Sequence, residues 1–504
     1  MTLASNRRTF LKSAIAAGAA VGAADLFGKL PAVSAKESKL DPKLVRLDSN
    51  VEPLVRLLEE TPREKLLEEV GDRIRKGAAY REVLAALLLA GVRNVQPRPN
   101  VGFKFHAVLV VNSAHLASLN SPDQHRWLPI FWALDNFKSA QAQNLKESGW
   151  RMGPVNESKI PSARKARQAF IDAMENWDVE AADAAVAGLA RTSGINETFE
   201  LFAKYGCRDF RDIGHKAIFV ANTYRTLHCI GWQHAEPILR SLAYALLKHE
   251  DTNPARRDGA PDRPGRENAK RIAAIPDNWQ EGKPDDGVVQ SVLASLRKST
   301  AAELCAQVVE MLAKGASPQS IWDGLLLGAG ELLMRQPAIV GLHAVTTTNA
   351  LRYLYEASGN DQTRRMLLLQ NAAFLPLFLE AMKGRGKVDE SRVDAVEPAQ
   401  SKSVTPEEIF ADVGRDRAAA GAKTLAYLQS GGDAKALIDH ARVLIFTKGT
   451  DSHDYKFSSA VLEDYDHVSP TWRNRYLASG TYWLRGSMAK DNALVQRARA
   501  ALKG

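Results

Sequence analysis

Apolar residues recur at intervals of three and four along most of this chain, which is the spacing of one buried face of an α-helix. The stretches with this period that are long enough for about three to five helical turns are 80–96, 105–119, 126–145, 215–230, 236–247, 302–313, 321–335, 343–357, 362–382, 417–429 and 434–446. Runs of alternating apolar and polar β-branched residues, the pattern of a half-buried strand, are absent from the sequence. The sequence therefore predicts an all-α fold.

Two polar stretches interrupt this pattern. Residues 251–286 carry prolines among charged side chains, and residues 384–407 are polar with little periodicity. Both compositions are typical of loops or flexible segments. We therefore expect a linker at 251–290 between a first helical half, 36–250, and a second helical half, 291–504.

The two halves resemble each other at three places that keep a nearly constant offset of 237 or 238 residues. The matching pairs are Leu87-Leu88-Leu89 with Leu325-Leu326-Leu327, His106 and Asn112 with His343 and Asn349, and His215 and Phe219 with His453 and Phe457. A constant offset over this length is hard to produce by chance, and its period is too long for a solenoid. It predicts an internal duplication whose two copies pack about a pseudo-twofold axis.

The duplication singles out four of the eleven histidines, namely His106, His215, His343 and His453. A single buried histidine on an amphipathic helix is more often a core residue than a metal ligand. Retention of both pairs in divergent copies favours metal binding, because symmetry-related helical residues face a common axis and bundle interiors can chelate metals. Imidazole suits iron, zinc, copper or nickel.

Lys456 follows His453 by three residues, so both side chains are expected on one face of a helix. Burial and positive neighbours lower the pKa of a lysine, and the neutral amine can add carbon dioxide to form a carbamate, which is an anionic oxygen ligand. The alternative is a surface lysine that pairs with Asp454 or Glu463. The first half has Ile218 at the equivalent position, so a carbamate would break the symmetry.

The segments 105–111, 214–219, 231–246, 343–346 and 452–456 resemble, in order and rough spacing, blocks of the questin oxidase-like proteins. That family is α-helical and oxidises aromatic polyketides such as anthraquinones with ring opening, and it includes non-haem iron enzymes with four histidines and a carboxylated lysine. The resemblance implies that the four histidines bind Fe(II) and that Lys456 is the candidate carbamate. The chain departs from the family pattern at 234–244, where members usually carry a second histidine before Gly-Tyr.

Several further residues are candidates for the site. His234 and Glu236 fall in the stretch where the resemblance is densest and could act as ligand or proton shuttle, although a helix start with Pro237 early in the helix explains them equally well. Asn112 and Asn349 could orient the ligands. Four aromatic residues could either wall a cavity for a flat substrate or simply pack in the core; they are Trp127, Trp132, Tyr224 and Trp232.

The N-terminus has the pattern of an export signal. Arg7 and Arg8 precede an Ala/Gly-rich apolar stretch, 14–27, and a small-x-small cleavage pattern that ends at Ala35. We expect residues 1–35 to be a twin-arginine signal recognised by the Tat export machinery, with a mature protein that is periplasmic or otherwise exported by this route. The apolar stretch contains Asp25 and is too short for a membrane anchor, and no membrane span is expected in the mature form.

Composition excludes some classes of function. The net charge is +9, and removing the signal takes away four cations and Asp25, which leaves +6. The charge is spread along the chain, so nucleic-acid binding is poorly supported. The cysteines, Cys207, Cys229 and Cys305, lack CxxC spacing and suit small core residues, with a Cys207–Cys229 bridge left open. No glycine-rich nucleotide motif occurs.

Taken together, the sequence predicts a metal-dependent, iron-containing oxygenase that acts on an aromatic or quinone-like small molecule. One alternative is a zinc-dependent hydrolase, in which the metal activates water. Another is an exported helical binding or scaffold protein without catalysis. Haem binding has little support because the chain has no CxxCH motif.

Overall fold

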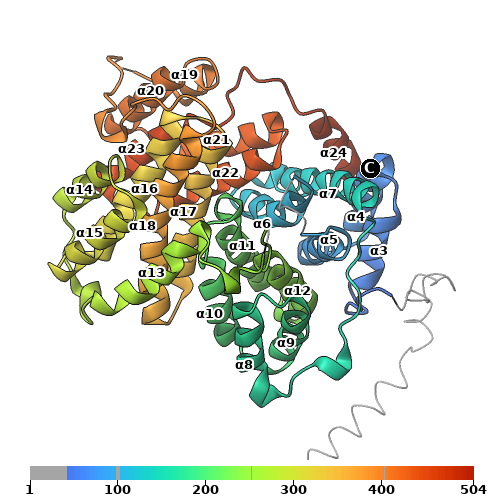
Figure 1. Cartoon of the computed structure of the whole chain (residues 1–504). Coiled ribbons are helices and arrows are strands. Elements are labelled where there is room, and N and C mark those ends of the chain that lie inside the picture. Colours follow the sequence, from blue (N-terminus) through green and yellow to red (C-terminus); the bar gives the residue numbers. More distant parts are fainter. Residues whose placement is uncertain (1–42, 98–102, 251, 402, 504) are drawn as a thin grey trace, which may run out of the picture.

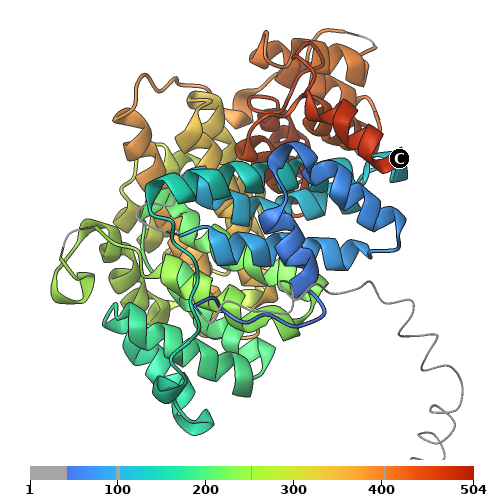
Figure 2. The same ribbon diagram turned by 90° about the vertical axis from the view of Figure 1, so that its right-hand side faces the viewer.

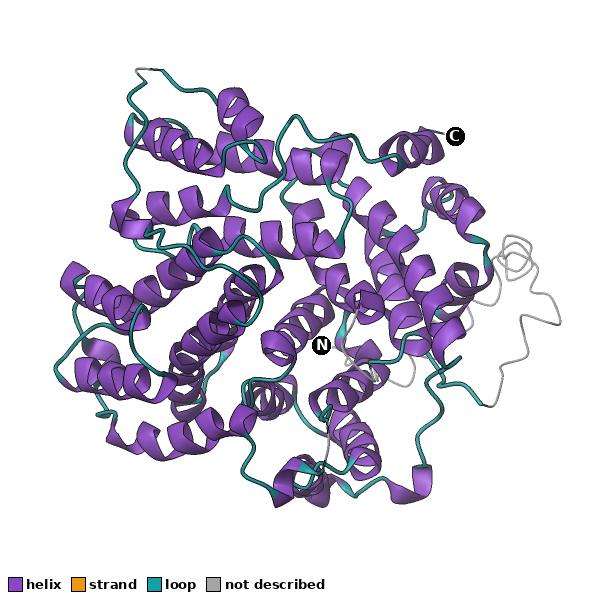
Figure 3. Ribbon diagram, turned by 45° about the horizontal axis from the view of Figure 1, so that its top comes forward, coloured by secondary structure: helices purple, strands orange, loops and turns teal. Residues whose placement is uncertain are grey.

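The computed structural model describes residues 43–97, 103–250, 252–401 and 403–503. Within these ranges the protein consists of 22 α-helices and short 3-10 helices, with no strand and one isolated bridge between Lys283 and Ala316 (Figures 1 and 3). The all-α prediction is therefore confirmed. The expected signal, 1–35, lies outside the described residues.

The helices of the first half are α3 (Glu52–Glu60), α4 (Arg63–Arg75), α5 (Tyr80–Asn94), α6 (His106–Leu119), α7 (Leu128–Glu147), α8 (Ala163–Glu175), α9 (Val179–Thr192), α10 (Ile195–Gly206), α11 (His215–Ile230) and α12 (Ala235–Leu246). Helices α5, α6, α7, α11 and α12 match predicted stretches to within a few residues. The predicted stretches do not include α3, α4, α8, α9 or α10. The buried face of α9 consists mainly of small residues, which gives a weak apolar signal. The other four helices each bury one apolar face, as α8 does with Phe170 and Met174, and the sequence analysis overlooked them.

Helix α13 (Arg263–Arg271) lies in the expected linker, and α14 (Asp286–Leu296) begins there. The further helices of the second half are α15 (Ala301–Ala313), α16 (Pro318–Arg335), α17 (Ile339–Ala357), α18 (Asp361–Lys383), α19 (Pro406–Asp412), α20 (Arg417–Gln429), α21 (Ala434–Lys448), α22 (Ser452–Asp464), α23 (Pro470–Gly480) and α24 (Leu494–Lys503). The 3-10 helices are η1 (Phe103–Phe105), η2 (Asp123–His125), η3 (Glu157–Lys159), η4 (Asp212–Gly214), η5 (Trp232–His234), η6 (Pro254–Arg256), η7 (Ala260–Asp262), η8 (Ile272–Ala274), η9 (Trp279–Glu281) and η10 (Val393–Ala395).

The expectation of a loop over 251–286 is wrong, because this stretch contains α13 and four 3-10 helices. The buried face of α13 includes Asn268, whose Nδ2 donates to Oε1 of Gln370 in α18 at 2.9 Å. A helix anchored by hydrogen bonds rather than by apolar side chains has no hydrophobic period to detect. The other polar stretch does contain mostly loop, with only η10 before α19 begins at Pro406.

Four helices form the centre of the molecule. Helix α6 packs against α11 and α22, and α17 packs against the same two helices (Figure 1). Helices α5 and α7 cover α6 from outside, while α16 and α18 cover α17. The last helix, α24, returns to pack on α4 of the first half, where Figures 1 and 2 show the red C-terminal helix beside the blue N-terminal ones. The two halves therefore share one interior.

Helix α18 is, among the described residues, the one helix long and apolar enough to cross a membrane by length and composition. Most of its apolar stretch is buried inside the protein, as in the core helix of a globular fold. All three cysteines are free thiols, so the Cys207–Cys229 bridge that the sequence left open is not formed. Cys207 and Cys305 are buried, which agrees with their expected role as core residues.

Candidate metal centre

Four histidines from the four central helices meet inside the molecule. His106 and His215 are the first residues of α6 and α11. His453 is the second residue of α22, and His343 is the fifth residue of α17. Their exposed fractions lie between 1% and 5%. Helical side chains point back toward the N-terminus, so these imidazoles are directed toward the region where the four helices begin.

The ring nitrogens are close enough to share a ligand. Nε2 of His215 lies 3.1 Å from Nε2 of His106 and 3.0 Å from Nε2 of His343. The nitrogen ligand atoms that these three residues offer all lie within 4.8 Å of one another. The His453 ring completes the group, with its centroid 4.7 Å from the His106 ring and 5.3 Å from the His343 ring. We call these four residues the imidazole cluster.

Hydrogen bonds on the far side of two rings determine which nitrogen carries the proton. Nδ1 of His215 donates to the carbonyl of Asp212 at 2.5 Å, and Nδ1 of His343 donates to the carbonyl of Ile339 at 2.6 Å. Because a carbonyl only accepts, Nδ1 bears the hydrogen and Nε2 of the neutral ring presents a lone pair. Burial, above all, lowers the pKa of both imidazoles well below the ordinary value and so favours the neutral form. Two lone pairs therefore face each other at 3.0 Å, an arrangement that repels unless a cation lies between them.

Asp451 orients the fourth ring. Nδ1 of His453 lies 2.7 Å from Oδ1 of Asp451, and the same oxygen accepts the backbone N–H of His453. The hydrogen bond to the imidazole lowers the pKa of Asp451 to about 2. Carboxylates that hold the outer nitrogen of a histidine fix its orientation for metal binding. The sequence analysis missed this residue. An aspartate two residues before a histidine at a helix start could have indicated that its carboxylate holds the imidazole.

Lys456 lies beside the imidazole cluster. Its Nζ is 3.4 Å from Nε2 of His215, and the side chain is buried, which lowers its pKa to about 7. The alternative of a surface lysine paired with Asp454 or Glu463 is wrong, because Lys456 is buried and each of these carboxylates forms an ion pair with an arginine. An amine with this pKa is about half neutral near pH 7 and largely neutral above it, as carbamate formation requires.

A strained turn leads into His215. The three preceding residues, 212–214, have φ values of 51°, 48° and 79°, which is the left-handed region that non-glycine residues rarely adopt. The Asp212 carboxylate is held by Lys248, while the Asp212 carbonyl accepts from the imidazole. Backbone strain of this kind persists only where the surroundings enforce it, and it is common at functional sites. The turn therefore positions the His215 ring from outside the cluster.

His234 and Glu236 lie elsewhere. His234 is the N-cap residue of α12, and it lines a cavity of about 520 Å³ together with Glu236 and Arg191. The Glu236 carboxylate binds Arg191 at 2.7 Å. No residue of the imidazole cluster lines this cavity. The structure thus supports the helix-start interpretation of these two residues and does not bring them to the cluster.

The two asparagines do not hold the imidazoles through the hydrogen bonds that the structure gives them. Asn349 donates to Glu463 and to Asp464, each at 2.8 Å, and Asn112 donates to Asn222 at 3.2 Å. Each asparagine lies six residues, or about one and a half helical turns, beyond the histidine on its own helix. The asparagines therefore form a separate polar layer of the central bundle.

The four aromatic candidates lie in two separate places. Tyr224 and Trp232 pack against each other with ring centroids 6.0 Å apart. Trp132 stacks on Tyr455 at 4.2 Å, and Trp127 packs at the start of α7. They do not enclose one common cavity, so the core-packing alternative fits them better.

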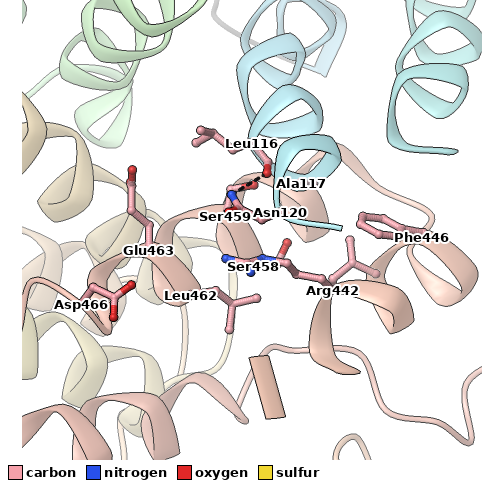
Figure 4. Close-up of a pocket in the computed structure, with 11 residues that line it drawn as sticks. Leu116, Ala117, Asn120, Arg442, Phe446, Ser458, Ser459, Leu462, Glu463 and Asp466 are labelled. Atoms are coloured by element: carbon pink, nitrogen blue, oxygen red, sulfur yellow. Dashed lines mark hydrogen bonds between the residues drawn. The ribbon is translucent and has the colours of Figure 1, made fainter. Parts of the chain in front are cut away.

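A cavity of about 230 Å³ opens between α6, α21 and α22 (Figure 4). Its lining residues are Leu116, Ala117, Asn120, Arg442, Ile445, Phe446, Ser458, Ser459, Leu462, Glu463 and Asp466. Leu116 is ten residues beyond His106 on α6, so the cavity and the imidazoles are separated by about 15 Å along that helix. The cavity therefore lies toward the opposite end of the central bundle from the cluster.

Comparison of the chain with models of known protein families, with curated proteins and with solved structures found no match. The chemistry of the site therefore has to be inferred from its geometry. A buried group of imidazoles whose lone pairs converge, with a neutral lysine beside them, is suited to a transition metal.

Proposed function

We propose that this protein is a non-haem iron oxygenase that oxidises an aromatic or quinone-like small molecule. One observation carries the metal centre: the Nε2 lone pairs of His215 and His343 face each other at 3.0 Å within a buried cluster. Iron and the substrate class follow from the resemblance of five sequence segments to the questin oxidase-like proteins. The candidate ligands are the four histidines of the imidazole cluster, with Lys456 as a carbamate.

The spacing of the imidazoles suits a shared metal ion. Two nitrogen ligands about 2.1 Å from one metal are about 3.0–3.4 Å apart, depending on the angle between their bonds. The Nε2 separations of 3.1 and 3.0 Å fall in this range. A catalytic zinc ion with an open position would fit the same ligands, so the zinc-dependent hydrolase is kept as the alternative that metal analysis separates.

The protein's own groups prepare the centre for dioxygen chemistry. When bound, iron(II) would supply the position at which dioxygen binds and is activated. The buried imidazoles exclude bulk water and present neutral nitrogens. The starts of α6, α11 and α22 bring the positive ends of three helix dipoles to the cluster, which stabilises negative charge on a ligand there.

Lys456 is proposed to supply that negative charge. Its neutral amine attacks the carbon of carbon dioxide, a C–N bond forms, and one proton leaves to solvent, so that an N-carboxylate replaces the amine. The protein is freed of metal and incubated with ¹³C-bicarbonate. We expect its carbon NMR spectrum to contain one carbamate signal, and we expect the spectrum of Lys456→Met to lack that signal. The matched control Lys138→Met removes another buried lysine, whose pKa is also lowered by burial, and keeps the signal. A signal that survives Lys456→Met would contradict the carbamate.

The duplication is proposed on three relations between the halves. By sequence offset, α6 corresponds to α17, and α11 corresponds to α22. The contact of α6 with α22 is therefore the equivalent of the contact of α17 with α11, and the structure contains both contacts. Arg225 and Glu463 are 238 residues apart and form an ion pair of 2.7 Å. Equivalent residues that touch each other lie beside a twofold axis, and the two helices that make this contact, α11 and α22, also carry His215 and His453 at their starts.

Export of the folded protein is part of the proposal. A twin-arginine signal at 1–35, read by the Tat machinery, would carry the protein to the periplasm after folding. Folding before export allows the metal to be inserted in the cytoplasm. Such a route suits a centre whose ligands come from four helices and exist only in the folded chain.

Metal content and oxygen uptake test the proposal. Protein purified without a metal-binding tag or resin is expected to contain one iron per chain, and the iron(II) form to consume dioxygen when hydroxylated anthraquinones are added. Stoichiometric zinc with no oxygen uptake would favour the hydrolase. Absence of any bound metal would favour the non-catalytic binding or scaffold protein.

Loss of Asp451 should weaken metal binding. The variant Asp451→Ala is expected to lower the affinity of the cluster about 10- to 100-fold, because the outer nitrogen of His453 loses its acceptor. Asp451 also caps α22, so the control is Asp433→Ala, which removes the equivalent cap of α21. Calorimetric titration with metal compares the two. Equal affinities in both variants would show that Asp451 acts only as a helix cap.

A further inference from the structure

Two pairs of aromatic side chains connect α22, the helix that carries His453, with α7 and connect the start of α7 with α5. Tyr455, next to Lys456, is fully buried and stacks on Trp132 of α7 with ring centroids 4.2 Å apart and 24° between the planes. Trp127, at the start of α7, precedes Trp132 by five residues, which corresponds to about 7.5 Å along the helix axis and about 140° around it. The two indoles are therefore not in direct contact, and an electron would have to cross the gap between them. The indole of Trp127 in turn packs against Tyr80, with ring centroids 5.2 Å apart.

The path ends at a hydrogen-bonded pair. The hydroxyl of Tyr80, the first residue of α5, lies 3.0 Å from Nδ1 of His115 in α6. His115 is 6% exposed, and burial lowers the pKa of its imidazole, so the ring is neutral and its Nδ1 can accept the phenolic proton. Burial also raises the pKa of Tyr80 to about 12, so that the phenol keeps its proton near neutral pH. Tyr80 and Trp127 are only partly buried.

We propose that Tyr80 and His115 form a redox-active dyad at the end of a one-electron path through Tyr455, Trp132 and Trp127. The proposal rests on the proposed function for its oxidant, which is an oxidising equivalent left by dioxygen at the metal centre when no substrate is bound. Indole and phenol rings are the side chains that most readily give up one electron. A buried oxygenase centre without such an outlet would oxidise its own ligands.

The step balances within these residues. Tyr80 loses one electron and its phenolic proton; the O–H bond breaks and an N–H bond forms at Nδ1 of His115. A neutral tyrosyl radical and an imidazolium remain. The electron reduces the oxidised indole of Trp127, which has itself given an electron through Trp132 and Tyr455 to the oxidant at the centre. Because the proton moves only as far as His115, the oxidised phenol does not remain as a radical cation in this partly buried site.

The dyad is tested first without any metal. The full chain, treated with a chelator, is oxidised by photochemically generated tris(bipyridine)ruthenium(III), and tyrosyl radicals are followed by transient absorbance and electron paramagnetic resonance. We expect a long-lived radical that Tyr80→Phe removes. In His115→Leu its lifetime should fall by about tenfold, the factor expected for one lost hydrogen bond. The control Tyr427→Phe removes a phenol that binds the Asp433 carbonyl, and it should change nothing. A long-lived radical that persists in Tyr80→Phe would overturn the dyad.

The path is tested with iron. In the iron-loaded chain mixed with hydrogen peroxide, the Tyr80 radical is expected to form more slowly in Trp132→Phe than in the wild type, while the photochemical result stays the same. Equal rates would overturn the path. If the wild-type chain takes up no iron and forms no radical with peroxide, the proposed function and the path both fail, whereas the photochemical experiment still decides the dyad.

Discussion

Replacing His343 with alanine is expected to abolish stoichiometric metal binding, with a loss of affinity above about 100-fold, since removal of groups that merely orient a ligand already costs 10- to 100-fold. His343 is the most buried of the four histidines and shares the 3.0 Å Nε2 contact with His215. Its removal takes away one lone pair and opens a space that water can enter. Metal analysis of the purified variant and calorimetric titration of the metal-free form measure the effect.

The control for this experiment is His228→Ala, which removes an exposed histidine of α11, the helix that carries His215. It should retain full metal content. His343→Gln preserves most of the side-chain volume, so a loss of metal in that variant cannot be attributed to a cavity. Full metal occupancy in both His343 variants would mean that the metal, if any, is bound elsewhere.

Replacing Gly214 with alanine is expected to lower the free energy of unfolding by about 3 kcal/mol and to displace His215. Gly214 has a φ of 79°, where an L-residue costs about 1–2 kcal/mol. A Cβ at this position would also overlap the side chain of Thr347 in α17, and such overpacking costs about 1–3 kcal/mol. Because Gly214 precedes His215 directly, relief of the overlap should move the imidazole and weaken metal binding. Denaturant unfolding and metal titration measure the two effects.

Gly77→Ala separates the two causes. Gly77 has a φ of 102°, but a Cβ there would meet no atom within 4 Å. This variant should therefore lose only about 1–2 kcal/mol, the cost of the left-handed conformation, and bind metal normally. If Gly214→Ala were no more destabilised than Gly77→Ala and bound metal equally well, the turn before His215 would have no special role in the cluster.

Of the four central helices, the largely apolar α6, α11 and α17 could be predicted from the sequence, whereas α22 could not. The prediction for 215–230 matches α11 at both ends, where Gly214 and Gly231, both with positive φ, interrupt the helical conformation. The four histidines lie together as the sequence analysis expected from their two pairs at a nearly constant offset. Their binding of a metal stays a prediction.

Other features leave little trace in the sequence. Helix α13 is anchored by Asn268 and the packing of Gly265, so its buried face is polar or small and carries no hydrophobic period. The hydrogen bond from His215 is accepted by the backbone carbonyl of Asp212. Because every residue has such a carbonyl, the residue types in the sequence do not reveal this contact. The pairing of Tyr80 with His115 joins two helices, and no local spacing reports it. Contacts made by backbone or between distant elements cannot be inferred from one sequence without homologues.

Anomalous X-ray scattering at the iron edge, measured on crystals of the protein grown without added metal, tests the metal centre most directly. We expect one strong peak per chain, about 2.1 Å from Nε2 of His106, His215 and His343 and within reach of His453. A map with no peak at this point, with the rings still in contact through their nitrogens, would contradict the metal centre and with it the oxygenase.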